Sequence, residues 1–136
     1  MSEEEWKKFL LDGDPVAVSN YCEIRWGIPR EPVWVDGAEA TAPAAGTALV
    51  SRTVSAGMTG RVFGVHISAD EGNQFRLYVD ATVVKRFALV AAGTIHIVLA
   101  LPLKDNIAAG SVVSIKNVVA GATGKVYQAS VLYDEA

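Results

Sequence analysis

The sequence predicts an all-β fold: a jelly-roll-like sandwich of about seven to eight short antiparallel strands, preceded by a short N-terminal helix and an extended arm. Two observations predict it. From Thr47 onward, short runs rich in Val, Ile, Phe and Tyr alternate with turns that contain Gly, Asp or Asn, which is typical of a sandwich or barrel. A pattern, V-x-A-G-x-T-G-[basic]-V-[aromatic], also occurs twice, starting at Val54 and at Val118. We therefore divide the chain into an N-terminal helix and arm, 1–46, and a sandwich domain, 47–136.

The helix is expected from Ser2 to Leu11. Ser2 and Glu5 form an S-x-x-E capping box, in which the two side chains satisfy backbone donors at the start of a helix. An apolar stripe follows at helical spacing and consists of Trp6, Phe9 and Leu10. A helix of this length is marginal alone, so the stripe is expected to pack on another surface.

The arm continues to residue 46 without a periodic pattern. Pro29, Pro32 and Pro43 keep it extended, and 37–46 is rich in Ala. Tryptophans occur only in this part of the chain, and they are frequent anchors of protein interfaces. The residues predicted to contact a neighbouring subunit or a larger assembly are Trp6, Phe9, Leu10, Trp26 and Trp34. The alternative is an arm that folds over a sheet of its own domain.

The strands of the sandwich are expected near 47–54, 60–68, 73–79, 82–89, 93–100, 111–119 and 124–133. In the two copies of the repeat, the paired glycines Gly57/Gly60 and Gly121/Gly124 are expected to allow positive φ at matched turns. Alternation places Phe63, Val65 and Ile67 on one face of their strand, and Tyr127, Ala129 and Val131 on one face of theirs. We expect these two faces to meet in the core, with Phe63 and Tyr127 buried at equivalent positions.

Composition narrows the classes of function. The net charge is −3, which favours neither nucleic acid nor an anionic membrane as a partner. Apolar residues make up 51% of the chain and charged residues only 20%, so we expect part of the apolar surface to be covered in a homo-oligomer. Cys22 is the single cysteine, which excludes an intrachain disulfide. We find no signal peptide and no transmembrane segment, and we expect a cytoplasmic protein unless it is viral.

No motif for catalysis or metal binding is present. His66 and His96 each lie between apolar residues in predicted strands, and a zinc site would need three or four converging ligands. No serine lies in G-x-S-x-G. Two turns offer oxygen ligands that Ca²⁺ could use, Asp12/Asp14 and Asp70/Glu71/Asn73, but neither matches an EF-hand loop. We therefore expect no catalytic residue, no cofactor and no metal, and a non-enzymatic protein.

A carbohydrate- or ligand-binding module is the alternative function. Such modules stack sugars on exposed aromatic side chains. The aromatic residues from 47 onward lie in strand patterns where burial is usual, and no tryptophan occurs there. An aromatic sugar platform on the sandwich is therefore not expected from the sequence.

Several segments carry a resemblance to small β-sandwich proteins of tailed viruses and prophages, over residues 53–136. These segments are TVSAGMTGRVFGVHISA (53–69), Asn73-x-Phe75, AAGTIHIV (91–98) and GKVYQASVLYDEA (124–136). The resemblance implies a virion component: a capsid-decorating or tail-associated structural protein that forms a symmetric homo-oligomer, often a trimer, and contacts a capsid or tail protein. It implies no catalytic residue. The leading function from the sequence is thus a structural or assembly protein.

Overall fold

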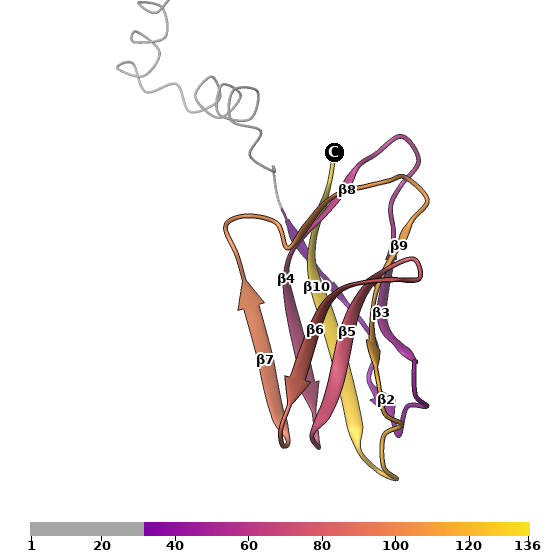
Figure 1. Cartoon of the computed structure of the whole chain (residues 1–136), viewed down its shortest axis with the longest axis vertical. Helices are drawn as coiled ribbons and strands as arrows, with labels where there is room; N and C mark the ends of the chain where they lie inside the picture. Colours follow the sequence, from indigo (N-terminus) through magenta and orange to yellow (C-terminus); the bar gives the residue numbers. More distant parts are fainter. Residues whose placement is uncertain (1–31) are drawn as a thin grey trace, which may run out of the picture. The chain divides into compact units, whose positions relative to one another are not determined.

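The computed structural model describes residues 32–136, which form ten strands in two antiparallel sheets and contain no helix. The all-β sandwich predicted from the sequence is confirmed. The predicted N-terminal helix lies outside the described residues. Figure 1 shows β4, β10 and β7 of one sheet and β5, β6, β3 and β9 of the other.

Sheet A contains six strands in the order β1-β10-β4-β7, with β2 paired to β10 and β8 paired to β4. Its strands are β1 (Val33–Asp36), β2 (Ala40–Thr41), β4 (Gly60–Ala69), β7 (Gly93–Val98), β8 (Lys104–Ile107) and β10 (Val126–Glu135). Sheet B contains four strands in the order β3-β9-β5-β6. Its strands are β3 (Ala48–Thr53), β5 (Asn73–Val79), β6 (Thr82–Leu89) and β9 (Val112–Asn117).

The strand order is that of a jelly roll. Without the short strands β2 and β8, eight strands remain, which can be counted from first to eighth along the chain. Sheet A then has the order first-eighth-third-sixth, and sheet B has the order second-seventh-fourth-fifth. Two four-stranded sheets with interleaved connections of this kind define the jelly roll among all-β folds. The first strand of this order is β1, so the jelly roll is complete only with a segment that precedes residue 47.

This position of β1 corrects the expected domain boundary. Residues 33–46 were assigned to the arm, yet β1 pairs with β10 along its whole length, from Val33 opposite Tyr133 to Asp36 opposite Ser130. Strand β2 also pairs with β10. The sandwich therefore begins at Pro32, as a compact unit that extends to Ala136. Pro32 and Gly37 bracket this strand.

The core lies between the inner faces of the two sheets. Alternation along the strands turns every second side chain inward, and the largest fully buried ones include Tyr127, Phe75, Ile67, Leu77 and Ile115. The Phe75 ring, from sheet B, lies 5.9 Å from the Tyr127 ring of sheet A, measured between centroids. Alternation along β4 and β10 allowed the sequence to predict part of this inner surface, since Val65, Ile67, Ala129 and Val131 are buried.

The two copies of the repeat are not structurally equivalent, contrary to expectation. Their strands, β4 and β10, are neighbours within sheet A and do not face each other across the core. Phe63 and Tyr127 are both buried, as predicted. However, the register of β4 against β10 shifts between Leu132 and Tyr133, where a bulge places Val62 opposite Tyr133. Val62 therefore joins the hydrophobic core cluster, and Phe63 is buried outside it.

The glycines of the repeat also have different roles. Gly57 and Gly124 have positive φ, at 75° and 78°, but they occupy different positions of the pattern. Gly60 and Gly121 instead allow close packing. A Cβ atom on Gly60 would lie 2.9 Å from the Tyr133 hydroxyl oxygen, and one on Gly121 would lie 3.1 Å from the Tyr127 ring.

A carboxylate joins the two sheets next to the first copy of the repeat. Glu135 of β10 accepts hydrogen bonds from the Ser55 backbone N–H at 3.1 Å, from the Ser55 hydroxyl, and from the Tyr133 hydroxyl at 2.7 Å. It also forms an ion pair with Arg52 of β3 at 3.2 Å. The hydrogen bonds from Ser55 and Tyr133 lower the pKa of Glu135 to about 2. Burial, with the adjacent Glu135 carboxylate, raises the pKa of Tyr133 to about 12.

Candidate functional site

The outer face of sheet A is a regular grid of side chains from β1, β10, β4 and β7. Because cross-strand partners stand side by side and alternate residues face the same way, the register defines three rows on this face. The tryptophan row is Trp34, Leu132, Gly64 and Val98; the histidine row is Asp36, Ser130, His66 and His96; the glutamine row is Gln128, Ser68 and Thr94. The tryptophan row and the glutamine row are four residues apart along β10, or roughly 13 Å.

Trp34 is the dominant apolar group of this face. It is 38% exposed, although it reaches from β1 across the sheet to the imidazole of His96 on β7. The Trp34 and His96 rings lie 5.5 Å apart with an interplanar angle of 31°, and the His66 ring meets the indole edge-on at 6.4 Å. Gly64 of the same row packs closely on β7, since a Cβ there would lie 2.3 Å from the Ile97 carbonyl oxygen. The two imidazoles therefore support the indole from one side and leave part of it open to solvent.

The histidine row contains two hydrogen bonds. The Ser130 hydroxyl donates to Oδ1 of Asp36 at 2.7 Å, and Nδ1 of His66 lies 3.0 Å from Nδ1 of His96. A nucleophilic serine would donate its hydroxyl hydrogen to an imidazole, with the carboxylate behind that imidazole. Here the carboxylate takes the hydroxyl hydrogen itself, so this row does not have the arrangement of a catalytic triad.

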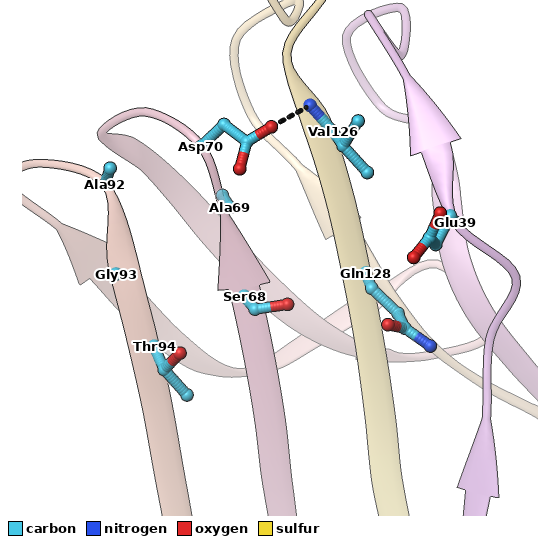
Figure 2. A pocket seen from close by; sticks show the side chains of 9 residues that line it. All are labelled: Glu39, Ser68, Ala69, Asp70, Ala92, Gly93, Thr94, Val126 and Gln128. Carbon is cyan, nitrogen blue, oxygen red and sulfur yellow. Dashed lines mark hydrogen bonds between the residues drawn. The ribbon is translucent and has the colours of Figure 1, made fainter.

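Beyond the histidine row, the glutamine row borders a shallow polar hollow of about 490 Å³. Figure 2 shows Ser68 and Thr94 on neighbouring strands and the Gln128 side chain on the side of Glu39. The Gln128 amide donates to the Gly37 carbonyl at 3.2 Å, which fixes its orientation. Hydroxyl, amide and carboxylate groups thus line one end of the face, and the indole lies at the other.

The three rows and the hollow together form a region whose charge is acidic or neutral. Asp36, Glu39 and Asp70 are its acids, and neither the three rows nor the hollow contains a lysine or an arginine. Asp70 accepts a hydrogen bond from the Val126 backbone N–H at 3.0 Å. An anionic ligand bound across this region would therefore meet carboxylates without a compensating cation, which disfavours its binding.

The acidic turn at residues 70–73 stabilises the fold. Glu71 accepts hydrogen bonds from the Tyr127 hydroxyl at 2.7 Å and the Ala122 N–H at 2.9 Å, and these bonds hold the pKa of Glu71 below its usual value. Asn73 donates to the Tyr127 hydroxyl at 2.9 Å. Among residues 32–136, no three His, Cys, Asp or Glu side chains converge to hold a metal ion. The other acidic turn, Asp12/Asp14, lies outside the described residues.

Of the residues predicted to form an interface, the structure places Trp34, which lies on the outer face of sheet A. Trp6, Phe9, Leu10 and Trp26 lie outside the described residues. The sequence reading missed the face because it placed Trp34 in the arm and concluded that the sandwich has no tryptophan. The run Val33-Trp34-Val35 was the available signal, since β-branched and aromatic residues are enriched in strands.

The described part of the chain contains no helix with the length and apolarity of a membrane span. No protein family model matches the chain, and no curated protein matches it either.

Three solved structures show a distant likeness. A family two carbohydrate esterase from Clostridium thermocellum with cellohexaose is 16% identical, with a TM-score of 0.38 over 72% of this chain and 26% of the esterase. An active-site mutant of a family two esterase from that bacterium is 14% identical, with a TM-score of 0.40 over 76% of this chain and 31% of the mutant. An acetyl xylan esterase from the rumen bacterium Butyrivibrio proteoclasticus is 8% identical, with a TM-score of 0.38 over 78% of this chain and 33% of that enzyme. The chain thus spans about a quarter to a third of these esterases, and at such scores the likeness carries no argument about function.

Proposed function

We propose that this protein is a non-enzymatic carbohydrate-binding β-sandwich whose outer face of sheet A binds a neutral polysaccharide. The observation that carries the proposal is the Trp34 indole, exposed on a flat sheet face and supported by His66 and His96. The apolar face of a sugar ring packs on such an indole, while its hydroxyl groups need hydrogen-bond partners nearby.

Those partners are present on the same face. Ser68, Thr94 and Gln128 stand in one row at the polar hollow, with Glu39 beside them. The roughly 13 Å between the tryptophan and glutamine rows provides room for several consecutive sugar units. The open, shallow shape suits a chain that lies across the sheet, and the absence of cations from the three rows and the hollow favours a neutral glycan over a uronic-acid or sulfated one.

Affinity electrophoresis in gels that contain soluble glucans, xylans, mannans or uronic-acid polysaccharides tests this proposal. At least one neutral polysaccharide should retard the protein, and Trp34→Ala should weaken that binding about tenfold or more, because tryptophan anchors contribute strongly to binding. Tyr78→Ala on the outer face of sheet B is the matched control and should bind normally. Equal binding by both variants, or no binding to any neutral polysaccharide, would reject the proposal.

A second candidate is the structural role that the sequence suggested, in which the chain forms a symmetric homo-oligomer as a virion accessory. The observation that favours it is an apolar edge beside the tryptophan row. Val98, Leu99 and Leu101 are 53%, 45% and 78% exposed. Burial of such an edge against a second copy would remove apolar surface from water.

Light scattering on the full chain tests the second candidate. An oligomer should form, and Leu101→Ser should lower its association constant without unfolding the subunits. A monomer at the highest soluble concentration would exclude this role, and it would leave the carbohydrate proposal intact.

A further inference from the structure

The two histidines of this chain are 30 positions apart in sequence, yet they are direct neighbours in the fold. His66 of β4 and His96 of β7 are cross-strand partners. Their ring centroids lie 5.2 Å apart at an interplanar angle of 72°, and their Nδ1 atoms lie 3.0 Å apart. His96 is exposed and His66 is half-buried, so solvent reaches the pair.

The separation of the two Nδ1 atoms suits a shared metal ion. Imidazole nitrogens bind Zn²⁺ at about 2.0–2.1 Å, and bond angles between about 90° and 109° place two such nitrogens roughly 2.9–3.4 Å apart. The distance between the two nitrogens can then stay as it is, while each ring turns its Nδ1 lone pair from the neighbouring nitrogen towards the ion. In the hydrogen-bonded pair, one Nδ1 carries the hydrogen and the other accepts it. For both to coordinate, that hydrogen moves to Nε2 of the same ring, and both Nδ1 lone pairs become available.

We propose that His66 and His96 form a two-histidine surface site for a divalent transition-metal ion: Cu²⁺, Ni²⁺ or Zn²⁺. Imidazole is a preferred ligand of these ions, whereas Mg²⁺ and Ca²⁺ prefer oxygen. No third protein ligand converges within the described residues, so water or a bound molecule occupies the remaining coordination positions. The site is thus an exchangeable one, and the fold does not depend on it. This inference does not rest on the carbohydrate proposal.

Neighbouring groups favour the site. The indole of Trp34 contacts both rings and restricts their rotation, which lowers the entropy lost on coordination. Asp36 lies in the same row, and its carboxylate adds negative charge that attracts a cation. The sequence excluded a metal because neither histidine has a partner at short spacing. Cross-strand register supplies the partner that spacing in sequence could not reveal.

The test uses the full chain without a histidine tag and with Cys22→Ser throughout, because a thiol also binds these metals. Ni²⁺ binding is measured by calorimetry, and Cu²⁺ binding by quenching of tryptophan fluorescence. We expect one ion per chain. His96→Gln should weaken binding about tenfold or more, and Trp34→Phe should reduce the Cu²⁺ quenching while Ni²⁺ still binds.

His96→Gln is the primary variant because that side chain is exposed and its loss leaves the core unchanged. Asp80→Asn, at the end of β5 in sheet B, is the control for non-specific cation binding and should bind as the parent does. The proposal is wrong if the parent binds no Ni²⁺, or if His96→Gln binds Ni²⁺ within twofold of the parent. Sugar binding is not part of either readout, so this test and the carbohydrate test fail independently.

Discussion

The two outer faces of the sandwich each carry one large aromatic side chain, but in different surroundings. On sheet A, Trp34 lies on two imidazoles and keeps part of its ring open to solvent. On sheet B, the Nζ atom of Lys116 lies over the Tyr78 ring, 4.9 Å from its centroid. Lys116 also stands in a cross-strand row with Arg76 and Arg86. One aromatic ring is available to a ligand, and the other is already covered by a cation.

The difference shows how an edge strand can determine which face carries an open aromatic ring. Both outer faces arise from the same alternation of buried and outward residues. Sheet A gains its tryptophan from β1, a four-residue strand that comes from the start of the described chain and pairs with the last strand. Without β1, the outer face of sheet A would retain its histidines and hydroxyl groups and would have no large apolar surface for a sugar ring.

The largest expected effect comes from Gly64→Ala, which disturbs the strand pairing of sheet A and leaves the outer face of sheet B unchanged. A Cβ at this position would lie 2.3 Å from the Ile97 carbonyl oxygen of β7, so β4 and β7 would have to move apart. We expect a loss of about 3 kcal/mol in the free energy of unfolding, measured by urea denaturation. Ala88→Ser adds one heavy atom to the outer face of sheet B and should change stability by less than about 0.5 kcal/mol. Equal effects would show that β7 is not tightly paired at Gly64.

The next effect concerns Glu135, which links sheet A to Arg52 of sheet B. The pKa of Glu135 is lowered from 4.5 to about 2 in the folded protein. Its ionised form therefore stabilises the fold above pH 4.5, and this contribution disappears as the pH falls from 4.5 towards 2. Glu135→Gln should lower stability at pH 7 by about 1–3 kcal/mol and flatten the acid part of the curve. Thermal melts from pH 7 to 2 measure it, and parallel curves for parent and variant would contradict the assigned role of Glu135.

The smallest effect tests the cationic row of sheet B. Arg76 has Lys116 and Arg86 as its cross-strand partners, and like charges opposite each other repel. Arg76→Gln should therefore raise the free energy of unfolding by about 0.3 kcal/mol at low salt, and added salt should reduce the gain. Lys85→Gln removes the same charge beside the row and should have no such effect. A destabilised Arg76→Gln would mean that the row is held by contacts stronger than the repulsion.

Most strands could be predicted from the sequence because their signals are local. The expected ranges 73–79 and 82–89 coincide with β5 and β6, where β-branched and aromatic residues recur and the Asp80-Ala81 turn separates the two runs. Strand β1 could not be read in this way, because it is short, lies between Pro32 and Gly37, and depends on pairing with β10 about one hundred residues away. The bulge that separates Val62 from Phe63 is also set by a partner strand.

The candidate site was harder to predict for the same physical reason. His66 and His96, or Ser130 and Asp36, become neighbours only through the register of four strands. The sequence offered no local motif that would mark the site. It could not indicate that the only tryptophan among the described residues lies over the only histidine pair there.

The most direct test of the account is amide chemical-shift mapping on the full chain, titrated with an oligosaccharide of the neutral polysaccharide that it binds. The account predicts shifts at Ser68, Thr94 and Gln128 and at the Trp34 indole N–H, with Arg76 and Lys116 unmoved. Shifts concentrated on Arg76, Tyr78 and Lys116, or no shifts at saturating oligosaccharide, would contradict the assignment of the binding face to sheet A.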